Sequence, residues 1–521
     1  MKKIFKKVIS VFLALSIVFS MACVGVFAEA KTAAEELKTL EKNIPIVEIP
    51  GFGDKPIYKG LSTETEEDDE NIWAFSADEI VPLIMKHLPN LIFSMMFGKY
   101  ERMDVILTDV LGTIFGAAAC DENGVPSPDT GLKYSEEIMA KEEYGKRNSY
   151  YFSYDWRLDM HTISVQLHEF IEEVMRVTGA EEVGLVSFSM GGAVMMTYLY
   201  EYYYLASPEE RDHIHSAIFL SGAMNGVECC GDPFSGNIVF DSTSLIRLLT
   251  ETISANENLV WLSDFIGIMY SLKMFEPLIS YTNDCLIPNL DKMSDNSITE
   301  SIGTIPAFYA LMSSERYYQA ESFVFNTDAD REKYSVIIEK SRYYHENVQA
   351  NSDDIIGALI EDGKNFAVIS EYGHAMLPVT SDNDRMADGM IGTYSTSFGA
   401  TCAEIDGILG ENYVQAVTCE CGKNHVSPDN QIDASTCKYP DVTWFAKKIK
   451  HENDDKYFAD LIDIITYSKN QVTVHTYADM PQFMVNQQNL RLVPMNETNA
   501  GKVVPFEETT LVGRFLKALF G

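Results

Sequence analysis

Basic residues are scarce in this sequence, and their scarcity excludes several classes of partner. Lys and Arg together number 40 against 77 Asp and Glu, which gives the 521-residue chain a formal net charge of -37. A surface this acidic repels phosphate backbones, so nucleic acid is not expected as a partner. The same field opposes binding to anionic bilayers, unless a local apolar or basic patch overrides it.

Two further absences narrow the class of protein. Beyond the N-terminal region, no stretch holds about eighteen uninterrupted apolar residues, so the mature chain is not expected to span a membrane. No internal repeat is visible in the sequence. The composition, 46% hydrophobic and 22% charged, excludes collagen-like, coiled-coil and wholly disordered chains and is typical of a globular protein.

The N-terminus has the pattern of a secretory signal peptide. Four lysines within the first seven residues precede an apolar core, VISVFLALSIVF, at residues 8–19. Val26 and Ala28 then supply small residues at the −3 and −1 positions of a cleavage site, which predicts removal of residues 1–28 and a secreted protein. Lipid attachment at Cys23 is a weaker alternative, because Ser20 stands where a lipoprotein signal prefers an aliphatic residue.

Eight cysteines remain after the signal peptide, and an even number in an exported chain permits disulfides of unknown connectivity. Cys419 and Cys421, together with His425 and Cys437, resemble a zinc cluster. The Cys-x-Cys spacing is tighter than structural zinc sites usually have. We therefore expect no metal at these residues, and no cofactor.

Short apolar segments alternate with helical patterns in the first half of the mature chain. Gly-rich or polar turns separate them, and this rhythm predicts a mostly parallel sheet with helices on both faces. The predicted strands are IPIVEI (44–49), SYYFSYDW (149–156), VGLVS (183–187) and AIFLSG (217–222), and the helices cover 164–177 and 190–203.

The rhythm breaks after the strand at 217–222. Residues 223–365 hold helical patterns and loops with no clear strand, which predicts a helical cap inserted into the sheet domain. FAVISEY (366–372) and YVQAV (413–417) then resume the sheet. We therefore expect one α/β domain over residues 29–455 and a C-terminal extension over 456–521.

The segment SFSMGG at 187–192 is the strongest chemical signal. A strand that ends at Ser187, a sharp turn centred on Ser189 and a helix that opens at Met190 form the context of a nucleophile elbow. Such a turn needs small flanking residues, which Gly191 supplies on one side and Ser187 on the other. The helix N-terminus directs free N–H groups, that of Met190 first, toward an oxyanion formed at Ser189.

A nucleophilic serine needs a histidine base, and in this class the chain order is Ser, acid, His. Four histidines follow the last strands: His374, His425, His451 and His475. His374 follows its strand too closely to leave room for the acid. His451 ends the segment WFAKKIKH, which reads as a helix. His425 follows YVQAV in a loop and is therefore the predicted base.

The predicted acid is Asp388, because Gly389 permits a tight turn directly after its carboxylate. Asp382 and Asp384 lie in a polar cluster typical of a solvated loop, and Glu371, within a strand, is the fallback. A second oxyanion donor is expected from the loop after the first strand, where PGFG places the N–H of Phe52 between Gly51 and Gly53.

Several of these motifs together resemble a known family. PIVEIPGFG, YDWRLD (154–159), the serine elbow, the DG acid motif and CDENGVPSPDTG (120–131) are similar to the lecithin:cholesterol acyltransferase-like α/β-hydrolases, which act on lipid esters. The resemblance covers about residues 44–225 and 366–445. It implies that Ser189, Asp388 and His425 are nucleophile, acid and base, and that Phe52 and Met190 form the oxyanion hole.

Two positions depart from the family pattern. Ser187 replaces the usual glycine, and the acid motif reads ADGMI where GDGTV is more usual. Both leave the predicted triad intact but weaken any transfer of substrate identity. Within YDWRLD, we expect Asp155, Trp156 and Arg157 to brace the strand end and not to contact substrate.

The expected activity is that of a secreted serine esterase or lipase that hydrolyses or transfers acyl groups of lipid-like esters. An amidase or peptidase with the same triad, and a non-catalytic surface-binding protein on a hydrolase scaffold, are the alternatives. Apolar helical patterns at 244–275, with Trp261, Phe265 and Phe275, fit either ordinary packing or a lid that contacts a lipid surface transiently.

Overall fold

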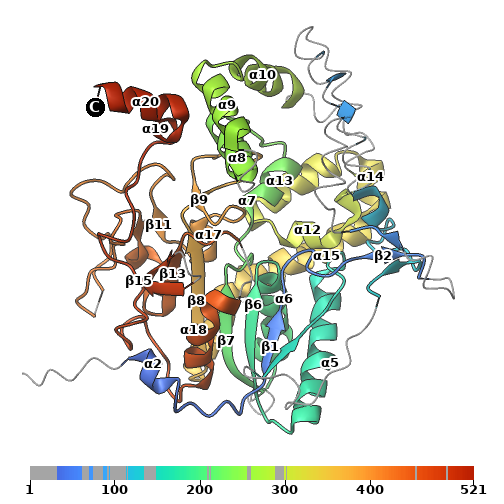
Figure 1. Cartoon of the computed structure of the whole chain (residues 1–521). Coiled ribbons are helices and arrows are strands. Elements are labelled where there is room, and N and C mark those ends of the chain that lie inside the picture. Colours follow the sequence, from blue (N-terminus) through green and yellow to red (C-terminus); the bar gives the residue numbers. More distant parts are fainter. Residues whose placement is uncertain are drawn as a thin grey trace, which may run out of the picture.

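The molecule is built around one central sheet with helices on both sides (Figure 1). The computed structural model describes residues 32–61, 70–73, 86–87, 89–90, 93, 109, 113, 115–133, 148–207, 211, 213–254, 260–287, 299–300, 302–419, 421–451, 455–487 and 491–520. The predicted signal peptide, including Cys23, lies outside the described residues. Within them, no helix is long and apolar enough to cross a bilayer.

Among the residues that the structure describes, the central sheet has eight strands, and every neighbouring pair is parallel except β14 and β15. Only β15 runs antiparallel, against β14 at one edge. This confirms the predicted α/β-hydrolase fold class, with a mostly parallel sheet between helices. In sheet order the strands are β15 (Arg491–Pro494), β14 (Phe483–Gln487), β13 (Thr443–Lys447), β8 (Asn365–Tyr372), β7 (Ile214–Leu220), β6 (Val183–Phe188), β1 (Ile46–Ile49) and β5 (Ser149–Tyr151).

The two faces of the sheet bury different helices because strand side chains alternate. In β7, Phe219 belongs to the cluster under α5 (Met160–Thr178), α6 (Gly191–Tyr198) and α16 (Ser352–Glu361). Its neighbour Ile218 belongs to the opposite cluster, under α18 (Asp455–Tyr467) and α2 (Ala33–Glu36). Covered on both faces, the central strands are apolar at nearly every position, as parallel sheets require.

Two sequence expectations about the late strands are wrong. WFAKK does not start a helix but forms most of β13, whose five residues are all buried between β8 and β14. Its Lys447 is accommodated there by an ion pair with Asp429, at 2.6 Å. YVQAV is not a strand: Val414 and Val417 are 79% and 51% exposed in an irregular loop outside the sheet.

The sheet domain also extends past the predicted boundary at residue 455. Helix α18 covers one face, and β14 and β15 complete the sheet edge, so residues 456–494 belong to the α/β domain. The C-terminal segment beyond β15 contains α19 (Phe506–Thr509) and α20 (Leu511–Phe520). Residues 511–520, which are amphipathic in sequence, therefore form a helix outside the sheet.

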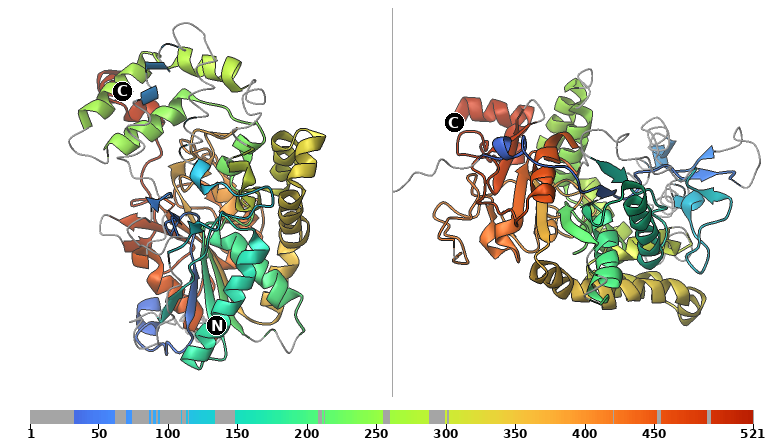
Figure 2. Two further views of the ribbon diagram at one scale, coloured as in Figure 1. Left: turned by 90° about the vertical axis from the view of Figure 1, so that its right-hand side faces the viewer. Right: turned by 90° about the horizontal axis from the view of Figure 1, so that it is seen from below.

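The described chain between β7 and β8 contains helices and no strand, where the sequence predicts a helical insertion. Its later helices pack on the sheet core, with Ala307 and Ile337 both buried there. Helices α8, α9 and α10 stand apart from the sheet, and α20 lies beside α9 (Figure 2). The insertion comprises α7 (Glu228–Phe234), α8 (Ser242–Ser254), α9 (Val260–Ser271), α10 (Glu276–Tyr281), α12 (Pro306–Ala310), α13 (Ser314–Val324), α14 (Asp328–Lys333), α15 (Ser335–Tyr343) and α16.

The close approach of α6 to β1 makes Gly191 a critical position for stability. A Cβ at Gly191 would lie 2.2 Å from the carbonyl oxygen of Ile49, which belongs to rigid backbone. We expect Gly191→Ala to lower the free energy of unfolding by about 1–3 kcal/mol or more, measured by denaturant unfolding. Gly357→Ala in α16 is the control, because no atom lies within 4 Å of the Cβ that alanine would add and alanine favours a helix. Equal midpoints for the two variants would contradict the prediction.

Candidate active site

Ser189 lies at the carboxyl end of β6 in a strained turn. Its φ is 54°, in the left-handed region that non-glycine residues rarely occupy, and α6 begins two residues later. Small neighbours allow this turn, because a Cβ at Gly51 would lie 2.8 Å from the Ser189 Cβ. The structure therefore has the geometry of the predicted nucleophile elbow, with Ser187 fully buried where glycine is usual.

The histidine beside Ser189 is His451. Its Nε2 lies 2.8 Å from Ser189 Oγ, and its Nδ1 lies 2.8 Å from Asp388 Oδ2. An ionised carboxylate only accepts, so Nδ1–H donates to Asp388, and Nε2 is left to accept the Ser189 hydroxyl proton. The ring of Phe188 packs against the imidazole, with 4.7 Å between the ring centroids.

Asp388 is fully buried, and the turn at Gly389 holds its carboxylate in place. Gly389 has a φ of 108°, and its turn lets Asp388 Oδ1 accept the N–H groups of Met390 and Ile391, both at 2.8 Å. The backbone N–H of His451 donates to the Asp388 carbonyl oxygen at 2.9 Å. These bonds leave Oδ2 directed at the imidazole, and the predicted acid is the carboxylate that meets the histidine.

The alternative carboxylates do not take that position. Asp382 is 53% exposed at its side chain and pairs with Arg385. Asp384 lies in the same segment, and burial together with neighbouring carboxylates raises its pKa. Glu371 is fully buried close to Asp388 and His451, but its Oε2 accepts a hydrogen bond from Ser221 at 3.0 Å.

His425, the base expected from the sequence, is not near Ser189, and this placement is corrected. Its Nδ1 bonds Gln482 Oε1 at 2.6 Å, and Gln482 directly precedes β14. Its other neighbour, Asp441, precedes β13, so His425 lies at the amino edge of the sheet. His451 lies beyond the carboxyl end of β13, and a five-residue strand separates its ends by roughly 15 Å.

The sequence held a signal that could have identified His451. Both histidines satisfy the order Ser, acid, His, so order alone could not separate them. The segment TWFA joins a β-branched residue to two aromatic ones, which favours a strand, and it follows a proline turn at Pro440. Read as a strand, it places His451 in the loop at the strand's carboxyl end, beside Ser189.

Two backbone N–H groups near Ser189 are available to an oxyanion. Among the described residues, no hydrogen bond is donated by the N–H of Phe52 or of Met190. Gly53 adopts a φ of 71°, and a Cβ at this position would lie 2.6 Å from the indole Nε1 of Trp73. The PGFG loop therefore needs glycine, and it lies against the elbow through Gly51.

The YDWR segment braces this loop, as its sequence predicts. Arg157 is fully buried and bidentate to Asp155, with Nε–Oδ1 and Nη2–Oδ2 distances of 2.9 and 2.6 Å. The Trp156 ring packs on Phe52, at 4.4 Å between centroids. Tyr154 donates its hydroxyl proton to the Pro50 carbonyl at 2.7 Å, and burial raises its pKa, so it remains a donor.

A comparison with protein-family models finds a match that lies around the serine elbow. Residues 134–259 match the family model described as lecithin:cholesterol acyltransferase, a range that contains both YDWRLD and the Ser189 elbow. Over these residues the chain is therefore similar to the lecithin:cholesterol acyltransferase family of α/β-hydrolases. The resemblance expected from the motifs is thereby confirmed over residues 134–259, and the matched family is named for an acyltransferase that acts on lipid esters. No curated protein matches the chain significantly.

Proposed function

We propose that this protein is an exported serine hydrolase that hydrolyses or transfers acyl groups of lipid esters through Ser189, His451 and Asp388. One observation carries the proposal: the two 2.8 Å hydrogen bonds that join the serine hydroxyl, the imidazole and the buried carboxylate. The strained turn at Ser189 supports it, because a hydroxyl held there is accessible to a substrate. The N-terminal pattern at residues 1–28 supports export.

The geometry suits acyl transfer in two steps, acylation of Ser189 and then deacylation. Ser189 Oγ attacks the ester carbonyl carbon while His451 Nε2 takes its proton, and the carbonyl oxygen becomes an oxyanion near the N–H groups of Phe52 and Met190. His451 then gives the proton to the leaving alcohol as the ester bond breaks. Water or a second alcohol attacks the acyl-enzyme by the same route, and Asp388 stabilises the imidazolium in both steps.

Ester substrates are favoured over the alternatives raised by the sequence. An amidase or peptidase could use the same three residues, but the family match covers enzymes of lipid esters. A non-catalytic binding protein has no need to keep a strained serine, a hydrogen-bonded histidine and a buried carboxylate in line. The net charge of the chain favours an ester with an uncharged or zwitterionic alcohol part.

Contact with a lipid surface is proposed through α9 and α20. These helices adjoin, with Arg514 3.3 Å from Asp264, and both expose large apolar side chains. Such side chains would insert into a neutral or zwitterionic interface, where the acidic surface meets no opposing field. The exposed fractions are 65% for Trp261, 52% for Phe265, 67% for Leu272, 61% for Phe515 and 48% for Leu516.

Replacement of the nucleophile provides the first test. Ser189→Ala should lower kcat for an acyl ester by at least about 10³-fold and abolish labelling by a fluorophosphonate probe, because no other hydroxyl is held against His451 among the described residues. Ser187→Ala is the control, since that serine is buried two residues away and should leave labelling intact. Wild-type labelling of Ser189→Ala would refute the proposed nucleophile.

The base is tested by comparing two histidines. His451→Ala should lower kcat by about 10³-fold or more, whereas His425→Ala, measured per folded molecule, should lose far less, because only His451 reaches Ser189. The comparison uses esterase assays in which the rate is divided by the folded fraction measured by circular dichroism. The same assay tests the acid: Asp388→Asn should lower kcat far more than Asp382→Asn, because only Asp388 contacts the imidazole. A reversed ranking within either pair would overturn the assignment.

The lipid-contact surface has its own test. A Trp261→Asp, Phe515→Asp double variant should slow hydrolysis of zwitterionic phosphatidylcholine vesicles, because burying two carboxylates in the interface is costly. Hydrolysis of a soluble short-chain p-nitrophenyl ester should stay unchanged, since the active site is untouched. Val414→Asp is the matched control, because Val414 is equally apolar and 79% exposed on a loop away from α9. Equal vesicle rates for all three proteins would exclude this surface.

A further inference from the structure

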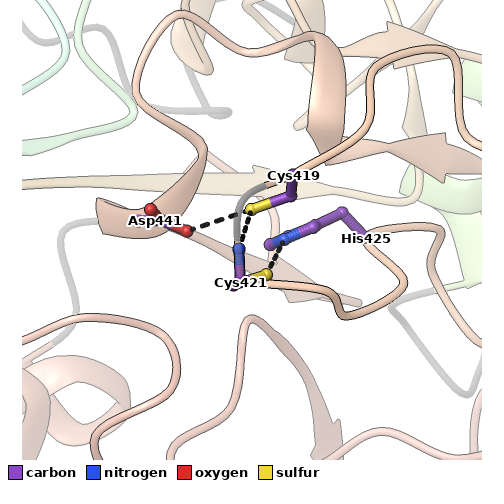
Figure 3. A group of neighbouring side chains, drawn as sticks. All are labelled: Cys419, Cys421, His425 and Asp441. Carbon is purple, nitrogen blue, oxygen red and sulfur yellow. Dashed lines mark hydrogen bonds between the residues drawn. The ribbon is translucent and has the colours of Figure 1, made fainter.

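A second cluster of reactive side chains lies at the amino edge of the sheet, away from Ser189. Cys419, Cys421, His425 and Asp441 point toward one another there (Figure 3). One ligand atom of each lies within 4.8 Å of every other. Cys421 Sγ lies 3.1 Å from His425 Nε2, and Cys419 Sγ lies 3.8 Å from Asp441 Oδ1. The chemistry proposed for Ser189 uses none of these groups.

The donor set and its spacing fit a tetrahedral zinc site. Zn–S bonds of about 2.3 Å and Zn–N bonds of about 2.0 Å place neighbouring tetrahedral ligands roughly 3.3–3.8 Å apart. The Cys421–His425 and Cys419–Asp441 separations of 3.1 and 3.8 Å bracket that range. Two thiolates with an imidazole select a soft or borderline cation over magnesium or calcium, which prefer oxygen ligands.

The imidazole of His425 is held in the tautomer that a metal needs. Its Nδ1–H donates to Gln482 Oε1 at 2.6 Å, so the lone pair of Nε2 faces the two sulfurs. Gln482 cannot reverse its amide, because its Nε2 donates to the carbonyl oxygens of Pro440 and Thr443 at 2.7 and 3.2 Å. A partner that fixes the outer nitrogen of a histidine is typical of metal sites.

Backbone N–H groups also donate hydrogen bonds to the two sulfurs. The N–H of Cys421 donates to Cys419 Sγ at 3.4 Å, and that of Lys423 donates to Cys421 Sγ at 3.3 Å. His475 Nε2 lies 3.5 Å from Asp441 Oδ1, next to the cluster. The cluster thus has both its ligands and the groups that position them.

We propose that Cys419, Cys421, His425 and Asp441 bind one zinc ion that has a structural role. The ion would tie the long loop that carries both cysteines and His425 to the segment that begins β13. His425 follows the Cys-x-Cys pair in the same loop, and Asp441 comes from the turn before β13. Cys437, which the sequence pattern groups with these residues, is instead buried in an apolar cluster with Tyr372 and Phe445.

The test is metal analysis of the purified full-length protein. Expressed with zinc and dialysed, the chain should retain about one equivalent of zinc, and cobalt substitution should give a thiolate-to-metal charge-transfer band. The Cys419→Ser, Cys421→Ser double variant should lose both signals. Removal of zinc by a chelator should lower the melting temperature of the wild-type protein but not that of the double variant.

Two milder variants locate the fourth ligand without disturbing the fold. Asp441→Ala removes an exposed side chain and should weaken zinc binding in a chelator competition. Cys437→Ala removes a thiol outside the cluster and should leave the zinc content unchanged. A wild-type chain that retains no zinc, or a Cys419–Cys421 disulfide found by mass spectrometry in zinc-supplemented protein, would overturn the proposal. Zinc lost from Cys437→Ala and kept by Asp441→Ala would overturn the ligand assignment.

Discussion

The parallel order β6, β7, β8, β13 in the central sheet is the constraint on which the candidate site depends. Because parallel strands end at the same edge, the chain delivers Ser189, the Asp388 turn and His451 to one place from positions far apart in sequence. Any slip in the pairing of β13 would move His451 away from Ser189. The apolar packing on both faces of the sheet, by α5 and α6 on one side and α18 on the other, therefore also sets the spacing of the hydrogen-bonded residues.

The same pairing gives the molecule a second, chemically different edge. Residues that precede strands β13 and β14, Asp441 and Gln482, meet at the amino edge and hold His425 there. One short strand thus separates a serine–histidine–aspartate arrangement from a thiol–imidazole cluster. A histidine at each end of β13 can serve different chemistry because the strand keeps the two environments apart.

Buried charge at the candidate site is tolerated because each group has fixed partners. Asp388 is fully buried, yet two backbone N–H groups and the imidazole satisfy its oxygens. Arg157 is equally buried and pairs in bidentate fashion with Asp155, which keeps Trp156 against the Phe52 loop. These local networks stabilise the turn at Ser189, where the backbone itself is strained.

The sequence by itself determined the α/β class, the elbow at Ser189, the Asp388–Gly389 turn and the role of the YDWR segment. Each of these depends on local patterns: a buried strand followed by small residues, or a carboxylate before a glycine. Only the tertiary structure decided between His451 and His425, and only it placed β14 and β15 in the sheet. The reason is physical: the residues of TWFAK only favour a strand, whereas pairing between β8 and β14, which are distant in sequence, fixes that strand and its place in the sheet.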